Sequence, residues 1–465
     1  MRSARNSPVS NPIVKFKKTP YRKANLMGPF RSGLTFRPGL IFLFAVLSVS
    51  VLFVLPARLQ ESAHLDSYTH EHCCAPYSAS SHSRGQLQIE LSGLFSTWGG
   101  FSRASGQSLG QLGVRFLPEF SLTFVPPSRK ASASNFTIEG SLNLQGSLTV
   151  QPGAENQFSG RLKPYRLSLR YAAPRFEARL GLQKISFGSA SLLRPLMWFD
   201  RIDPRDPLQL TDGVYALLLR AYFSSRTNLW AWTLYGNDDP KGWEILPTRR
   251  RRPEAGLRAQ VPIGPGELGF TAHRRRVEFN LAMAASNPAL HLIPLKQSSP
   301  LAFTFTETRL AADGKWDIGP GIWFEAALIE QRSPYLAFPW QRALTIGLDY
   351  TFALGNGLHL LGEYYQSDLS TGAFSGITCA PFRARFLATS ISYPLSFIDQ
   401  LAAIFFYDTR SRDFYSFVRW QRQYDRWSIH LMAFWNPAEF RLFAAPDQPN
   451  LFAGKGLQLL IVYTF

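Results

Sequence analysis

From about position 86 to the last residue, apolar and polar side chains alternate in segments about ten residues long. In the segment at 175–183, RFEARLGLQ, every second residue from Phe176 to Leu182 is apolar. Successive side chains of a β-strand point to opposite faces, so a period of two is typical of a strand with one apolar face. Glycine, proline, asparagine and aspartate punctuate the segments, as expected for turns. The pattern indicates antiparallel β-structure.

The segments number eighteen by this pattern, and strands of 9 to 11 residues are long enough to cross a membrane. The roughly 408 residues after position 57 allow about 23 residues for each strand and its connection. We therefore predict an all-β fold, a transmembrane antiparallel β-barrel of 16–18 strands and most simply about 18. The predicted strands start near positions 87, 112, 136, 161, 175, 213, 227, 253, 266, 301, 315, 342, 357, 383, 397, 413, 426 and 456.

The connections differ in length between the two ends of the predicted strands. Short turn sequences follow the even-numbered strands, including AAPR near 172, PIGPG near 262, ADGK near 312, LGNG near 354, YPLS near 393 and QYDR near 423. Long connections mostly follow the odd-numbered strands. A membrane barrel has tight turns at its periplasmic rim and longer loops at its outer rim. A soluble β-sandwich also has strands with one apolar face, but the difference between the rims favours the barrel.

The first 57 residues differ in character from the rest. They carry nine of the Lys and Arg residues and no Asp or Glu, which is half of the net charge of +18. The uncharged apolar run at 40–55 follows this basic stretch, as in a secretory signal peptide. An uncleaved anchor is the alternative, and Met27 is an alternative start. We expect a signal or targeting segment at 1–57, a short N-terminal periplasmic tail at 58–85 and the barrel at 86–465. Export makes nucleic acid an improbable partner.

The last strand carries a second pattern. Its apolar side chains share one face, and they are Leu457, Leu459, Ile461, Tyr463 and Phe465. Termini fray unless something ties them down, so we expect this strand to close the barrel against the first. The ending resembles the C-terminal signature of bacterial outer-membrane proteins. That resemblance implies a Gram-negative outer membrane, contact with its lipids, and recognition of this assembly signal by the barrel assembly machinery.

The connection at 184–213 is rich in side chains that need burial, including Leu196, Trp198 and Phe199. We expect it to fold inward. Acidic and basic residues recur within it. Rings of charged side chains select ions at a constriction, whereas Asp-Pro steps also initiate turns that arginines satisfy; both interpretations stay open. The predicted pore or constriction residues are Arg179, Gln183, Arg194, Asp200, Arg201, Asp203, Arg205 and Asp206.

The sequences RLGLQKISFG and DPLQLTDGV, within about 165–223, resemble porin-like outer-membrane families of the alginate-export and phosphate-selective kind. In those families a strand of this type leads into a constricting loop. The resemblance implies the passage of a solute through the barrel, without identifying it. Passive or weakly selective diffusion of small hydrophilic solutes is the function that we expect, and a homo-oligomer is compatible with it.

Arginine is the preferred cation after position 57, with 34 Arg and 7 Lys. Arginine rings favour anions, and the guanidinium fork suits carboxylate or phosphate. Neutralisation by glutamates on the same face, such as Glu177 and Glu363, is an equally weighted alternative. The predicted lumen arginines are Arg166, Arg170, Arg220, Arg258, Arg385 and Arg419. The runs at 249–252 and 274–276 suit lipid phosphates or are solvated charges.

No catalytic or metal motif stands out. Cys73 and Cys74 adjoin two histidines but fit no zinc spacing, and Cys379 is isolated. We expect no cofactor, no metal and no catalytic residue. The alternatives are a barrel enzyme acting on lipid or peptide at the outer rim, for which Ser428 and His430 are the nearest pair, and a plugged structural or adhesive barrel.

Overall fold

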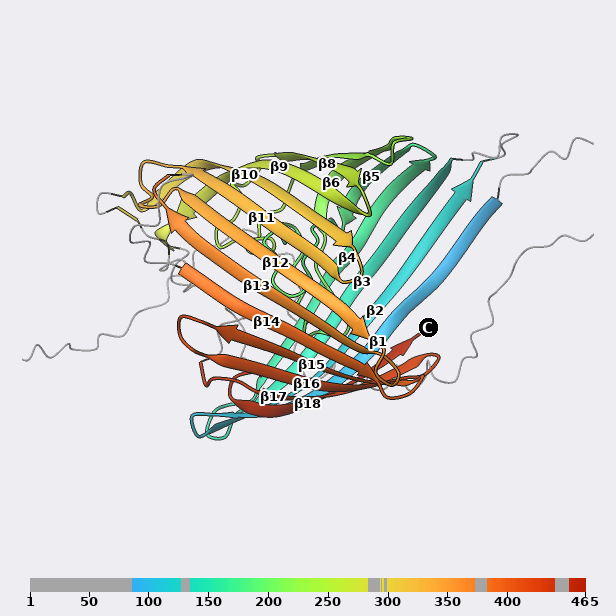
Figure 1. The fold of residues 1–465 in the computed structure, drawn as a ribbon, viewed down its shortest axis with the longest axis vertical. Coiled ribbons are helices and arrows are strands. Elements are labelled where there is room, and N and C mark those ends of the chain that lie inside the picture. Colours follow the sequence, from blue (N-terminus) through green and yellow to red (C-terminus); the bar gives the residue numbers. More distant parts are fainter. Residues whose placement is uncertain are drawn as a thin grey trace, which may run out of the picture. The chain divides into compact units, whose positions relative to one another are not determined.

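The computed structural model describes residues 86–126, 134–282, 293, 295–296, 299–372, 383–439 and 451–465. The predicted targeting segment and periplasmic tail lie outside these residues. Within the described ranges, no helix is long and apolar enough to cross a membrane. The described chain forms eighteen antiparallel strands in one sheet (Figure 1).

The strands follow one another in space as they do in sequence. They are β1 (Gln86–Ala104), β2 (Gln107–Val125), β3 (Asn135–Val150), β4 (Gln157–Ala173), β5 (Phe176–Gln183), β6 (Val214–Tyr222), β7 (Asn228–Leu234), β8 (Glu254–Ile263), β9 (Gly266–Asn280), β10 (Ala302–Asp317), β11 (Gly321–Arg332), β12 (Trp340–Phe352), β13 (Leu358–Ser370), β14 (Arg383–Pro394), β15 (Asp399–Asp408), β16 (Phe414–Gln423), β17 (Trp427–Trp435) and β18 (Lys455–Thr464).

The sheet closes on itself because β18 pairs with β1 as well as with β17. Leu94 to Arg103 pair with Thr464 to Lys455, and Phe465 exchanges two backbone hydrogen bonds with Gly93. The expected closure of the last strand against the first is confirmed. β1 and β2 continue past this point, with Gln86 opposite Val125. The fold is the expected antiparallel barrel, and the strand count of eighteen is confirmed.

The outer face of the barrel is apolar. On β2 the outward side chains include Leu112, Phe116 and Phe120, while the inward ones include Arg115 and Glu119. On β18 the five apolar residues from Leu457 to Phe465 face outward in register with Leu431 and Trp427 of β17. A closed barrel with an apolar exterior satisfies every backbone group internally and can face lipid. The chain is a β-barrel protein of the outer membrane.

Most connections differ between the two rims as the sequence predicts, but some do not. The connection between β1 and β2 is short although it lies on the long-loop rim, and the connection between β2 and β3 is long although it lies on the other. The expected ADGK turn near 312 is wrong, because these residues lie inside β10. Asp313 faces the lumen and binds Arg258, so a charge that suggested a turn is neutralised within the barrel. The turn lies at 318–320.

The alternation of faces generates a stability prediction. Leu112 faces outward at the middle of the apolar band, beside Leu148 and near Leu459, whereas its neighbour Gln111 faces inward. We expect L112R to lower the free energy of unfolding by about 2–4 kcal/mol, because lipid solvates a guanidinium poorly. Q111R should cost far less, and denaturant titration of both variants in lipid vesicles measures the difference. Equal losses would contradict the assigned faces.

Candidate functional site

The connection at 184–213 lies inside the barrel, and its apolar side chains pack against the inner wall. Leu192 and Leu193 join a cluster with Phe406, Phe417 and other residues of β11 and β13–β17. Leu196, Trp198 and Phe199 join a second cluster with residues of β6, β7, β10 and β11. Both clusters are built from inward-facing side chains, which is unusual for a lumen and explains why this loop is so rich in Leu and Trp.

Two carboxylates of the wall hold the backbone of this inward loop. Glu363 of β13 accepts hydrogen bonds from the backbone N–H groups of Ser191, Leu192 and Leu193 at 2.6–3.0 Å. It also accepts one from Trp323 Nε1 at 3.0 Å. Hydrogen bonds to a charged acceptor are about twice as strong as neutral ones. This carboxylate therefore fixes one turn of the loop to the wall.

Glu325 of β11 makes the second attachment. Its carboxylate accepts from the backbone N–H groups of Ala190 at 2.8 Å and Leu196 at 3.0 Å. Gly188, with φ of 105°, passes so close to this carboxylate that a Cβ atom would collide with it. The hydroxyl of Thr345 on β12 donates to the carbonyl of Leu193 at 2.6 Å. The sequence pattern did not identify these anchors, although a lone glutamate in an apolar strand segment is the available clue.

A second connection, at 235–253, also packs inside. Lys241 binds Glu254 of β8 at 2.8 Å, and Glu244 binds Arg275 of β9 and Arg309 of β10, both at 2.8 Å. Both arginines also bind Glu307, at 2.6 and 2.7 Å. Three cations and three carboxylates balance in this buried network, to which His273 adds a 3.1 Å contact with Glu254. The wall of β8–β10 is thus neutralised where the loops cover it.

Several predicted constriction residues lie within the inward loop and hold it together. Arg194 binds Asp200 at 2.9 Å and the carbonyl of Phe187 at 3.0 Å, and both charged side chains are buried. Gln183 is buried as well and donates to the carbonyls of Arg179 and Ala216. These contacts favour the structural interpretation for Arg194, Asp200 and Gln183.

The remaining members of the predicted set bind at the edges of the loop. Arg201 donates to the carbonyl of Gly242 at 2.9 and 3.1 Å, which ties the two inward connections together. Arg205 forms a fork with Asp203 and lies over the rings of Phe417 and Phe452, at 5.3 and 4.6 Å from their centroids.

Asp206 differs from the other loop carboxylates. It accepts the backbone N–H of Leu208 at 3.0 Å and lies within electrostatic range of Arg115 on β2 and Arg419 on β16. Burial raises the pKa of Asp206 above its usual range. The loop therefore presents this carboxylate toward arginines of the facing wall. Arg115 was not among the predicted lumen residues, although the alternation on β2 places it inward.

Five of the predicted pore and lumen arginines lie on the wall formed by β2–β6 and β16. Arg166, Arg170, Arg179, Arg220 and Arg419 face inward, as expected. Arg170 binds Glu177 at 3.1 Å, and Arg179 lies 3.7 Å from Glu177 and 3.8 Å from Glu139. Glutamates thus neutralise part of this wall.

Four of the inward arginines form no ion pair with a described carboxylate. Arg115 donates to Gln145 at 2.9 Å, Arg166 donates to the carbonyl of Thr211 at 3.0 Å, and Arg220 stacks over Trp230 at 4.0 Å. Among the described residues, no carboxylate lies within ion-pair distance of these three or of Arg419. We name Arg115, Arg166, Arg220 and Arg419 the open arginines.

Two predicted lumen arginines are placed differently. Arg258 faces inward, but it is buried against Asp313 at 2.5 and 2.9 Å beneath the inward loop. Arg385 does not face the lumen. It lies opposite Gln366 of β13 in the strand register and shares the outward face of β14 with the exposed Leu387, because the half-buried Phe386 and the buried Ala388 take the inward positions. The assignment of Arg385 to the lumen is wrong.

The pair considered for catalysis lies inside the barrel. Ser428 Oγ and His430 Nε2 are 3.0 Å apart on the inward face of β17. Nδ1 of His430 has no hydrogen-bond partner in the described part of the chain, so the carboxylate that would orient a catalytic histidine is missing there. The group at 70–74 and Cys379 lie outside the described residues, so the expectation that they hold no metal remains a prediction.

Comparison with solved structures finds similarity to bacterial outer-membrane proteins. The anion-selective porin of Comamonas acidovorans has 11% identity and a TM-score of 0.41, over 82% of this chain and 100% of its own. The outer-membrane channel DcaP of Acinetobacter baumannii has 12% identity and a TM-score of 0.41, over 82% and 97%. OmpF of Salmonella typhi has 10% identity and a TM-score of 0.41, over 81% and 97%. No family model and no curated protein matches the chain.

The anchoring of the inward loop by Glu363 can be tested by hydrogen exchange. The E363Q variant replaces the carboxylate by an amide. The amide has one weaker acceptor oxygen, and its two N–H donors would face the backbone N–H groups of the loop. Each charge-assisted bond contributes about 1.5–3 kcal/mol, so we expect the amides of Ser191, Leu192 and Leu193 to exchange at least about tenfold faster. E139Q, on the inward face of β3, is the control. Unchanged exchange in E363Q would show that packing alone holds the loop.

Proposed function

We propose that the barrel is a porin-like channel for passive, weakly selective diffusion of small hydrophilic solutes, with a preference for anions. The single observation that carries the proposal is the set of open arginines, which face the lumen without carboxylate partners. Arg115 and Arg419 lie within electrostatic range of Asp206 on the inward loop, so two guanidinium groups stand near this carboxylate. Side-chain charges at such a constriction select ions of the opposite sign.

The partition of charge within the barrel supports this direction of selectivity. Under the inward loop, Lys241, Arg275 and Arg309 are balanced by Glu244, Glu254 and Glu307. That balanced network contributes little field to the rest of the lumen. The facing wall keeps an excess of guanidinium groups, whose planar forks suit carboxylate and phosphate groups. We also propose, from the sequence resemblance, that the chain is related to the alginate-export or phosphate-selective families.

A barrel enzyme is the less favoured function. Ser428 and His430 are close, but their surroundings supply a cation, Arg419, rather than an orienting carboxylate. A completely plugged barrel is a second alternative, because the inward loop fills part of the lumen. Recognition of the C-terminal residues by the assembly machinery, homo-oligomer formation and the absence of enzymatic activity are parts of the same proposal.

Ion selectivity tests the proposal through the open arginines. In planar bilayers with a KCl gradient, we expect R115Q and R419Q each to lower the chloride-to-potassium permeability ratio by up to about fivefold. This bound follows from about 1 kcal/mol for unit charges 4 Å apart in water. R175Q, in the turn between β4 and β5, is the matched control and should leave the ratio unchanged. A wild-type channel that prefers cations would overturn the proposed selectivity.

The acidity of Asp206 gives a pH dependence. Burial raises the pKa of this carboxyl, so it takes up a proton at a higher pH than an exposed aspartate does. As the pH falls through the raised pKa, the loop loses a negative charge beside Arg115 and Arg419, and the preference for chloride should increase. D206N should show the increased preference at every pH and lose this part of the pH dependence. A preference for chloride that decreases on acidification in the wild type would contradict the assignment.

A further inference from the structure

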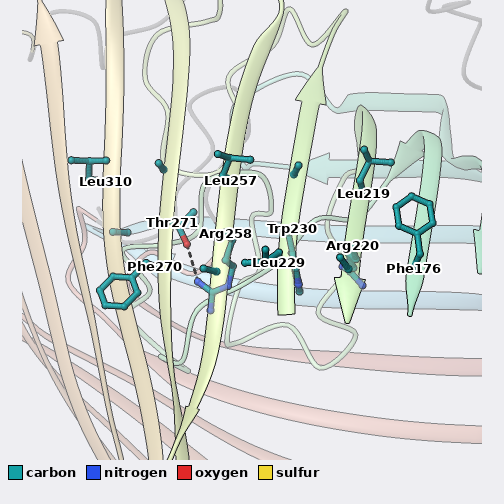
Figure 2. Close-up of a pocket in the computed structure, with 15 residues that line it drawn as sticks. Phe176, Leu219, Arg220, Leu229, Trp230, Leu257, Arg258, Phe270, Thr271 and Leu310 are labelled. Carbon is teal, nitrogen blue, oxygen red and sulfur yellow. Dashed lines mark hydrogen bonds between the residues drawn. The ribbon is translucent and has the colours of Figure 1, made fainter. Parts of the chain in front are cut away.

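The outward face of β5–β10 is hollowed by a groove. Its volume is about 680 Å³, and its lining is mostly apolar, although Arg220, Arg258 and Thr271 also border it (Figure 2). Large side chains in it lie on neighbouring strands and face away from the lumen, among them Phe176, Leu257 and Phe270. The barrel therefore presents a shaped depression to the membrane.

The groove arises from the register of the strands. Two neighbouring rows of outward positions cross β5 to β10, and each row alternates large and small residues from strand to strand. The two alternations are out of step, so every large residue has small neighbours. One row is Phe176, Ala221, Leu229, Ala259, Phe270 and Ala312; the other is Ala178, Leu219, Ala231, Leu257, Ala272 and Leu310.

Four alanines taken alternately from the two rows, Ala221, Ala231, Ala259 and Ala272, form a zigzag floor. Leu219, Leu257 and Leu310 line one side of it, and Phe176, Leu229 and Phe270 line the other, as Figure 2 shows. The whole lining reaches from Phe176 on β5 to Leu310 on β10, and six strands spaced about 4.8 Å apart give the groove a length of roughly 24 Å. That length exceeds half of the roughly 30 Å hydrocarbon core of a bilayer. The dimensions suit one extended hydrocarbon chain.

The groove also runs obliquely to the membrane. At one end Phe176 is the first residue of β5, directly after the turn at 174–175 of the short-turn rim. At the other end Leu310 and Ala312 lie well inside β10. The next outward positions on β9, β10 and β11 are polar, namely Arg274, Thr308 and Glu330. The groove thus begins where the apolar band ends on the loop side and descends into it.

Basic side chains gather at that upper end. Arg274 and Arg276 face outward on β9 and are exposed, whereas Arg275 between them faces inward. The backbone N–H of Arg249 donates to the carbonyl of Arg276 at 2.7 Å, which brings the run at 249–252 alongside. Arg250 reaches one carboxylate, Asp238, at 3.5 Å on an exposed surface. The upper end of the groove is therefore strongly positive.

We propose that this groove binds an anionic acyl lipid of the membrane, with one acyl chain on the alanine floor and the phosphate at Arg274 and Arg276. Lipid tails are as apolar as the groove, so burial of apolar surface alone favours no particular lipid. Affinity comes from close packing of the acyl chain and from the charged head group. A second copy of the chain fits the groove less well, because an isologous contact would bring the two arginine clusters together. The inference does not depend on channel activity.

Native mass spectrometry of the full-length barrel in detergent tests the proposal with defined lipids. The probes are a long-chain phosphatidylglycerol, the diacylglycerol with the same chains, and a short-chain phosphatidylglycerol. R274Q/R276Q removes the head-group contacts, and A231F/A259F fills the floor with apolar side chains that lipid tolerates. The controls are R175Q, at the other rim, and A433F, which faces outward on β17.

We expect R274Q/R276Q to weaken binding of the long-chain phosphatidylglycerol by about 30-fold, from about 1 kcal/mol for each basic residue near an anionic head group. A231F/A259F should weaken the long-chain lipid but leave the short-chain one unchanged, and the diacylglycerol should bind weakly throughout. Wild-type affinity in both double variants would overturn the proposal. So would an oligomer that A231F/A259F dissociates while lipid retention stays the same, because the groove would then be a contact between copies.

Discussion

The arrangement of the lumen depends on hydrogen bonds between the backbone of the inward loop and two carboxylates of the wall. A loop that leaves the rim and enters a barrel must satisfy backbone groups that strands satisfy by pairing. Glu363 receives three consecutive N–H groups and Glu325 receives two more. Because these acceptors lie on β13 and β11, the loop is drawn across the lumen from its origin after β5.

The position of the anchored loop accounts for the uneven distribution of charge around the lumen. The loop and its neighbour at 235–253 cover the wall of β8–β10, where a buried network of three cations and three carboxylates leaves no net charge. The wall of β2–β6 and β16 is not balanced in this way and keeps the open arginines. A lumen of this kind has one neutral, packed side and one positive side. The passage for solutes that we propose lies between the loop at Asp206 and the positive side.

Much of the fold could be predicted from the sequence, because alternation over eighteen segments is a local property that the barrel preserves. The predicted strand starts lie close to those observed for most strands, including β5, β9 and β14. The turn predicted at ADGK was wrong because its aspartate, Asp313, is neutralised within the barrel by Arg258, which is distant in sequence. The lumen position predicted for Arg385 was wrong because side chains alternate between the two faces of a strand. An error of one residue in this alternation reverses every assignment on the strand.

The site was predicted less completely for the same reason. The sequence showed that the loop at 184–213 needs burial, but the partners of its backbone lie more than a hundred residues away in β11 and β13. Sequence alone also left two interpretations of the loop charges open. The structure separates them: Arg194 and Asp200 bind each other within the loop, whereas Asp206 faces arginines of the wall.

The most direct test of this account is the single-channel current of a D206C variant before and after a cationic thiol reagent is added, with Cys73, Cys74 and Cys379 replaced by serine. If ions pass between the loop and the arginine wall, the account predicts stable current steps that change abruptly on modification, because a bulky charge then enters the proposed passage. A folded barrel that passes no current, or a current that modification leaves unchanged, would contradict it.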